Sequence, residues 1–203
     1  MNNKFMVLTN IHINILNKKK YKYPQNSTKI EDTNLWNFET YKKYLERKNI
    51  KYNKIFAQVE DIFIKLIISV KNKLLKEISS SNLESSNFYH LIGFDIILDE
   101  NLKAYLIEAN RRCKFRTDND VERYYSYNIL ADTFNILGLK PPKKKDKFKL
   151  LKKNIEDSLC ELDRPRGGYK LIFPLKSNIK NYRKFFGNSI SEEDKELWRK
   201  ILE

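Results

Sequence analysis

Hydrophobic residues recur at helical spacing in three stretches of the chain. This spacing predicts helices over about residues 38–48, 53–78 and 119–137, with Gly138 and the prolines at 141–142 closing the third. The helix over 53–78 carries an apolar stripe, which predicts the face that packs into the core. The members of this stripe are Ile55, Val59, Ile62, Leu66, Ile67, Val70 and Leu74.

The two ends of the chain have simpler patterns. Residues 1–16 predict a strand-like opening, and the polar residues 17–37 predict a loop. Near the C-terminus, Ser191 and Asp194 have the spacing of a capping box, which predicts the start of a last helix. Trp198 in that helix is expected to face the core.

Two short apolar segments predict a β-hairpin. Residues 91–98 and 104–109 are rich in apolar and β-branched side chains, and a polar stretch separates them. If the loop comprises the four residues 100–103, Asp99 pairs with Ala104 and the register of the whole hairpin follows.

This register brings three oxygen ligands to one face of the hairpin. Counting back from the loop, Ile96 pairs with Ile107 and Asp95 pairs with Glu108. Opposed residues project from the same face, and Asn110 joins them because side chains alternate with period two. Two carboxylates about 5 Å apart repel by roughly 3 kcal/mol at an effective dielectric constant near 20. Burial of the pair would add to this cost or keep one acid protonated.

A divalent cation would remove the repulsion. Carboxylate and amide oxygens are the hard ligands that Mg²⁺ prefers, and phosphate oxygens can complete its coordination shell; Mn²⁺ would satisfy the same oxygens. The alternative is a hairpin with solvated acids, which is the commoner fate of Asp and Glu on strands. The flanking sequence is apolar for an exposed face, and this favours the cation site.

The segment 87–110, NFYHLIGFDIILDENLKAYLIEAN, resembles the metal-binding segment of the tubulin–tyrosine ligase-like family, G-[FY]-D-x-x-[LI]-D-x-x-L-K-x-[WY]-L-[IL]-E-x-N. Other segments resemble further family blocks in the same order, and together they cover most of residues 7–140. They are LTN with IN at 8–14, Trp36 with the helix at 41–45, the helix from Ile55, and YNILADTFNIL at 127–137. Residues 166–174, with RGGY and IFP, resemble a tail motif of the glutamylating branch.

The resemblance implies a fold and an activity. The implied fold is α+β, the C-terminal part of an ATP-grasp domain in which an antiparallel sheet is packed by helices. This domain would span residues 1–140, and a basic helical extension would span 141–203. The implied enzyme uses ATP and Mg²⁺ to activate a carboxylate as an acyl-phosphate, which the amine of glutamate then attacks. Acidic tubulin tails would be the substrate.

The resemblance also implies site residues. Contacts with ATP are implied for Thr9, Asn10, Asp95, Ile107, Glu108 and Asn110. Of these, Asp95, Glu108 and Asn110 would hold Mg²⁺ on the phosphates, while Thr9 and Asn10 would contact the terminal phosphate. Asn10 and Arg111 are the implied catalytic residues.

The chain is strongly basic. It has 40 Lys and Arg against 26 Asp and Glu, a net charge of +14, which implies an anionic partner. Charge alone favours nucleic acid, but the sequence has no aromatic RNA-binding strand, zinc-finger spacing or GXXG loop. We therefore expect tubulin tails as the partner and no nucleic acid. The dense run at 143–153 is interpreted as a solvated helix face or tail, with a binding arm as the alternative.

Composition excludes several other classes. Cys113 and Cys160 are isolated, so no disulfide framework or thiolate zinc site is indicated, and a reducing compartment is expected. The two histidines exclude a histidine-rich metal site, and the five glycines form no P-loop or dinucleotide fingerprint. No apolar run reaches membrane length. We expect a soluble cytoplasmic protein of the microtubule cytoskeleton, with the cilium and basal body as candidate sites, and no membrane partner.

The chain departs from the family pattern. It begins near the LTN motif, so the upstream half of the ATP-grasp is expected to be absent and the chain alone to be inactive. After Asn110, where the family has small residues and Pro-Ser, the sequence reads RRCK at 111–114. These cations could clamp a phosphate or an acidic substrate, or they could mark relaxed constraint on the loop. The alternative function is a non-catalytic basic module that binds acidic microtubule tails.

Overall fold

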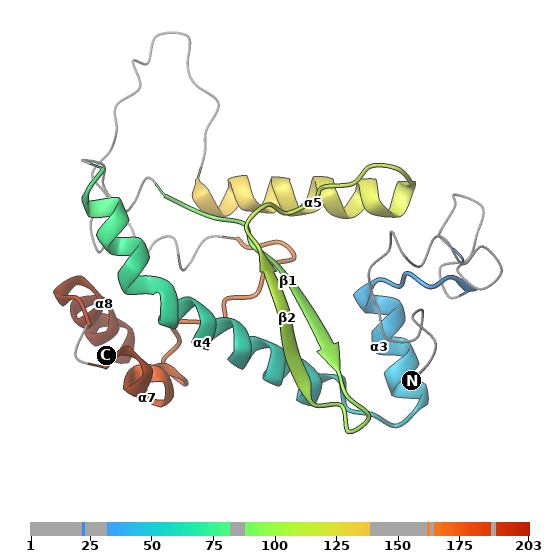
Figure 1. Cartoon of the computed structure of the whole chain (residues 1–203), viewed down its shortest axis with the longest axis horizontal. Helices are drawn as coiled ribbons and strands as arrows, with labels where there is room; N and C mark the ends of the chain where they lie inside the picture. The colour runs from blue at the N-terminus through green and yellow to red at the C-terminus, as the bar shows by residue number, and fades with distance from the viewer. Residues whose placement is uncertain (1–21, 23–31, 82–87, 139–161, 163–164, 188–189) are drawn as a thin grey trace, which may run out of the picture. The chain divides into compact units, whose positions relative to one another are not determined.

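The computed structural model describes residues 22, 32–81, 88–138, 162, 165–187 and 190–203 (Figure 1). This part of the chain contains helices and a two-stranded antiparallel sheet, and its class is α+β, as predicted. The elements are α3 (Phe38–Arg47), α4 (Tyr52–Ser79), β1 (Gly93–Leu98), β2 (Ala104–Asn110), α5 (Asp120–Leu137), α7 (Ile179–Tyr182), the 3-10 helix η3 (Arg183–Phe186) and α8 (Glu192–Leu202).

Contacts divide the chain into two compact units, which are described separately. The first comprises Met1–Lys54 and Arg116–Tyr124, and the second comprises Ile55–Phe115 and Tyr125–Glu203. The three predicted central helices are all confirmed, with ends within one residue of the predicted ones. Gly138 follows α5 with a φ of 65°, the left-handed conformation that glycine adopts after a helix.

The first unit is organised around α3. The side chain of Asn37 accepts a hydrogen bond from the backbone N–H of Thr40 at 2.7 Å and so caps the helix. Leu45 is 1% exposed, and the Trp36 ring lies against Tyr44 with centroids 5.2 Å apart. The described part of the first unit is therefore built on a capped helix with one buried face.

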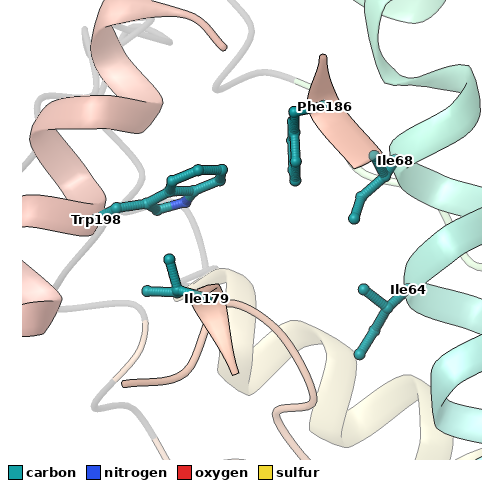
Figure 2. Packing of buried hydrophobic residues seen from close by; sticks show 5 residues of the cluster. All are labelled: Ile64, Ile68, Ile179, Phe186 and Trp198. Carbon is teal, nitrogen blue, oxygen red and sulfur yellow. The ribbon is translucent and has the colours of Figure 1, made fainter. Parts of the chain in front are cut away.

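The core of the second unit joins α4 to the C-terminal segment. Ile64 and Ile68 of α4 pack with Ile179, Phe186 and Trp198 (Figure 2). Phe186 and Trp198 meet edge to face with ring centroids 4.9 Å apart. The inward orientation predicted for Trp198 is thus confirmed.

Helix α8 begins where the capping box predicts. Ser191 precedes the helix in an extended conformation, and its hydroxyl accepts a hydrogen bond from the backbone N–H of Asp194 at 3.1 Å. The Asp194 carboxylate also pairs with Lys71 of α4. This cap therefore both starts α8 and connects it to the long helix.

The predicted apolar stripe of α4 is partly wrong. Ile55 is buried as expected, but Ile67, Val70 and Leu74 are 41%, 37% and 53% exposed. The buried positions of the core are instead Ile64 and Ile68. Apolar residues surround this helix almost completely over 62–68, so spacing alone does not decide which side the core covers. The C-terminal segment decides it by packing against Ile64 and Ile68.

A glycine turn over residues 166–169, the RGGY turn, docks on α5. Gly167 has a φ of 54°, and a Cβ on it would lie 2.0 Å from Oδ1 of Asp132. The N–H of Gly168 donates to Oδ2 of Asp132 at 2.8 Å, and the hydroxyls of Tyr169 and Thr133 are 2.9 Å apart. Only glycine at position 167 leaves room for this carboxylate, so the contact between the turn and α5 depends on Gly167.

Some predictions lie outside the described residues and stay predictions. They concern the opening strand over 1–16, most of the loop over 17–37, the basic run at 143–153 and the domain boundary at 140–141. Within the described ranges, no helix combines the length and apolar character needed to cross a bilayer.

Candidate functional site

The hairpin loop is longer than predicted. Leu98 pairs with Ala104, so the loop comprises five residues, 99–103, and the predicted pairing of Asp99 with Ala104 is wrong. Asp99 causes the difference, because its Oδ1 accepts backbone hydrogen bonds from Asn101 and Lys103, both at 2.9 Å. These bonds hold the pKa of Asp99 below its usual value, with the bond from Lys103 as the largest cause. An aspartate that binds the next backbone amides stabilises a turn in place of strand pairing.

A β-bulge restores the register at the acids. Ile96 pairs with Leu106, whereas Asp95 pairs with Glu108, so Ile107 is the extra residue on β2. The predicted pair of Ile96 and Ile107 is therefore wrong, but the predicted pair of Asp95 and Glu108 is confirmed. The bulge compensates for the extra loop residue and brings the two carboxylates opposite each other.

The three oxygen-bearing side chains occupy the end of the hairpin away from its loop. Glu108 and Asn110 are linked by a hydrogen bond from Nδ2 of Asn110 to Oε1 of Glu108 at 2.9 Å. Asn110 lies opposite Gly93, two residues before Asp95 on the same face. The structure thus brings together the three predicted ligands on one hairpin.

The Asp95 carboxyl is perturbed by its surroundings. Partial desolvation raises the pKa of Asp95, and a hydrogen bond with Glu108 and the negative charge of Glu108 raise it further. A carboxyl that keeps its proton can donate to its neighbour, and this is how a pair of close acids avoids repulsion without a counter-ion. The pair therefore has an electrostatic penalty that a bound cation would relieve.

The face that carries the acids is exposed among the described residues. Asp95 and Glu108 are both exposed, and their apolar neighbours Ile97, Tyr105 and Ile107 are 40%, 42% and 51% exposed. The expectation that the apolar flanking sequence argues against an exposed face is wrong. An ion or a phosphate can reach the carboxylates directly.

Helix α4 holds the loop end of the hairpin through a side chain that sequence reasoning missed. Nε2 of Gln58 donates to the carbonyl oxygen of Leu102 at 3.0 Å, and Oε1 of Gln58 accepts from the N–H of Ala104 at 3.2 Å. Further along, Phe63 of α4 stacks on Phe94 of β1 with ring centroids 4.1 Å apart. The only sequence feature that could have indicated the role of Gln58 is that this amide lies among the apolar residues 55–59 of the helix.

The donor set fits a hard divalent cation. Two carboxylates and an amide carbonyl are oxygen ligands of the kind that Mg²⁺ and Mn²⁺ bind. The amide nitrogen of Asn110 is used toward Glu108, which leaves its Oδ1 for an ion. Over the described ranges, no group of three or more His, Cys, Asp and Glu side chains is placed to hold a metal. The candidate site therefore consists of Asp95, Glu108 and Asn110, and phosphate oxygens could complete the coordination of a cation held there.

The remaining predicted site residues have different outcomes. Thr9 and Asn10 lie outside the described residues. Arg111 directly follows β2, and its carbonyl oxygen accepts a hydrogen bond from Nε2 of His90 at 2.6 Å. Ile107 occupies the bulge beside the acids. The roles expected of these residues stay predictions.

Comparison with known proteins identifies the family. The model of the tubulin-tyrosine ligase family matches residues 1–149, so the chain belongs to this family. Similar curated proteins are tubulin monoglutamylase TTLL4 of Mus musculus, 28% identical over 147 residues, and tubulin polyglutamylase ttll6 of Danio rerio, 26% identical over 215. Tubulin polyglutamylase TTLL5 of Homo sapiens is 29% identical over 138 residues. The resemblance to the glutamylating branch is thereby confirmed.

These alignments cover much of this chain and little of the relatives. They include 72%, 92% and 67% of the chain, in the same order, but 12%, 27% and 10% of the relatives. The chain thus spans about a quarter or less of the length of the proteins it matches.

Proposed function

We propose that the chain forms part of an ATP- and Mg²⁺-dependent carboxylate–amine ligase that adds glutamate to the acidic tails of tubulin. The observation that supports this most is the pairing of Asp95 with Glu108, with Asn110 bonded to Glu108. Membership of the tubulin-tyrosine ligase family supports the reaction class, and the similarity to tubulin glutamylases supports tubulin as the substrate. The proposed fold is the ATP-grasp.

The proposed reaction has two steps. An oxygen of the acceptor carboxylate attacks the γ-phosphorus of ATP, the bond to the β-phosphate oxygen breaks, and ADP leaves. The amine of glutamate then attacks the acyl carbon, loses a proton and displaces inorganic phosphate as the amide forms. When bound, Mg²⁺ supplies positive charge that neutralises the transferring phosphoryl group.

The residues of this chain would prepare that site. Asp95 and Glu108 would bind the cation as charged carboxylates, and Asn110 would orient Glu108 through its amide hydrogen bond. Gln58 binds the loop end of the same hairpin to α4. These hydrogen bonds help to maintain the strand register that pairs the acids, although they lie at the other end of the hairpin. Thr9 and Asn10 are proposed to contact the terminal phosphate, and Ile107 the nucleotide. Asn10 and Arg111 are the proposed catalytic residues.

The surface charge supports an acidic partner. The net charge of +14 would attract acidic polypeptide tails and raise their association rate. We accordingly place the protein in the cytoplasm, on the microtubule cytoskeleton, with the cilium and basal body as candidate sites.

Mg-ATP binding separates the ligase from a binding module without chemistry. Asp95→Ala should abolish Mg-ATP binding measured by equilibrium dialysis, while Glu100→Ala, which removes an exposed acid from the loop of the same hairpin, should leave it unchanged. Microtubule co-sedimentation should survive both substitutions. If the wild-type chain co-sediments with microtubules but binds neither Mg²⁺ nor Mg-ATP better than Asp95→Ala, the non-catalytic module is the better description.

A further inference from the structure

Three cations directly follow the candidate site and have no acidic partner among the described residues. Arg111, Arg112 and Lys114 are exposed, and none forms an ion pair with another described residue. Elsewhere in the same unit lysines do find acids, as Lys65 does with Asp61. The loop 111–114 therefore presents positive charge that no described acidic side chain neutralises.

The backbone of this loop is held against the hairpin. Nε2 of His90 donates to the carbonyl oxygen of Arg111 at 2.6 Å. A Cβ built on Gly93 would lie 3.6 Å from Cβ of Asn110 and 3.9 Å from Sγ of Cys113. The backbone at Arg111 and the side chain of Cys113 are thus held at the end of the hairpin that carries the oxygen ligands, and Arg112 lies between them in the sequence.

The length of the loop sets an upper limit on how far its cations can reach along an extended peptide. Four residues span at most about 14 Å when fully extended, so Lys114 lies within that distance of Asn110. Side chains on one face of an extended chain repeat every ~7 Å. If one acceptor carboxylate is at the reaction centre, the carboxylates two and four residues away can lie opposite the loop.

The charge balance favours such an acceptor. Without the loop, Asp95 and Glu108 would repel every carboxylate that approaches them. Arg111, Arg112 and Lys114 reverse the sign of the local charge, and guanidinium groups bind carboxylates through two parallel hydrogen bonds. An acceptor with one carboxylate gains little from this loop, whereas one with a run of carboxylates can engage several of its cations.

We propose that the loop 111–114 is a specificity determinant that selects acidic polypeptides with several carboxylates within about 14 Å of the one that is modified. This inference rests on the proposed function of the neighbouring site. In addition to the catalytic role proposed for Arg111, it assigns the side chains of Arg111, Arg112 and Lys114 to recognition of the acceptor carboxylates that neighbour the modified one.

The test uses the full chain and two fluorescent peptides, one with a run of glutamates and one with a single glutamate among glycines and serines. The triple variant R111Q/R112Q/K114Q is compared with K73Q/K76Q/K180Q, which removes the same charge from exposed positions on α4 and α7. The basic run at 143–153 is present in both variants, so its contribution cancels. Inorganic tripolyphosphate is the competing anion, and circular dichroism checks folding of each variant.

Each exposed ion pair between the loop and the peptide should contribute about 0.5 kcal/mol. Loss of all three in the loop variant should therefore weaken binding about tenfold. We expect this loss for the glutamate-run peptide with the loop variant only, and little change for the single-glutamate peptide. Unchanged binding of the glutamate-run peptide to the loop variant would overturn the proposal. Loss of tripolyphosphate binding alone would also overturn it, because the loop would then be a phosphate clamp. Mn²⁺ binding measured on the same samples reports on the proposed function separately, since it requires Asp95, and removal of the positive charges of the loop should not weaken it.

Discussion

Replacement of Asp95 by Asn should stabilise the metal-free protein at neutral pH. The substitution removes one of two opposed negative charges and keeps a side chain that can donate a hydrogen bond to Glu108. At about 5 Å the repulsion is worth ~0.8 kcal/mol in water and ~3 kcal/mol at an effective dielectric constant of 20. Because both acids are exposed, we take a value near the lower limit, about 1 kcal/mol.

The sign of the pH dependence follows from the pKa of Asp95. The folded state raises this pKa above the usual aspartate value of 3.8, so the proton is bound more tightly in the folded than in the unfolded chain. The resulting stabilisation is complete below pH 3.8 and is lost as the pH rises through the folded-state pKa. The stabilising effect of Asp95→Asn should therefore appear as the pH rises through this window, and it should vanish in acid.

Asp99 on the same hairpin provides a matched control with the opposite sign. Its folded-state pKa lies below the same usual value, chiefly because it accepts the backbone hydrogen bond from Lys103. Its stabilisation is present above pH 3.8 and is lost as the pH falls through the lowered pKa. Asp99→Asn should thus destabilise the protein at neutral pH, where Asp95→Asn stabilises it.

Thermal unfolding in chelator-treated buffer between pH 3 and pH 8 measures both effects. For a chain of this size, about 1 kcal/mol corresponds to a Tm increase of roughly 2–4 °C for Asp95→Asn at pH 7. Mg²⁺ at ten times its Kd should add about 1.4 kcal/mol to the wild type and at most about 0.4 kcal/mol to a variant that binds it at least tenfold more weakly. A neutral-pH Tm of Asp95→Asn equal to or below that of the wild type would contradict the repulsion argument.

Two further predictions concern the packing that supports the site. Gln58→Leu should cost about 1–2 kcal/mol in urea unfolding, because two backbone groups of the hairpin loop lose their partner; an unchanged midpoint would show that α4 does not hold the loop. Gly167→Ala should cost about 2–3 kcal/mol, since the left-handed backbone is strained and Asp132 must leave the N–H of Gly168. Gly168→Ala is its control and should cost little, because a Cβ there would lie 3.6 Å from Asp132; equal losses for both variants would refute the close approach at Gly167.

Sequence patterns predicted the elements well because each has a local cause. The ends of α3, α4 and α5 follow from apolar spacing and end signals, and α8 follows from the Ser191 capping box. The hairpin was found for the same reason, since apolar residues flank a polar loop. These signals are contained in a few neighbouring residues, so they can be read without tertiary information.

Tertiary contacts decided what the sequence could not. The face of α4 that is buried depends on Ile179, Phe186 and Trp198, more than a hundred residues further along the chain. The hairpin register depends on the Asp99 side chain and on the bulge at Ile107, which together shift part of the ladder and restore it at the acids. The two hydrogen bonds from Gln58 to the hairpin loop were not predicted, because a single amide side chain in a helix forms no sequence pattern that indicates its partner.

Titration of the protein with Mn²⁺ tests the central claim most directly. The electron paramagnetic resonance signal of free Mn²⁺ reports binding without nucleotide or tubulin, and the variants to compare are Asp95→Asn, Glu108→Gln and the loop control Glu100→Gln. We expect the wild type and Glu100→Gln to bind Mn²⁺ equally, and each of the other two to bind it at least tenfold more weakly. Equal binding by all four proteins would contradict the assignment of Asp95 and Glu108 as a cation site.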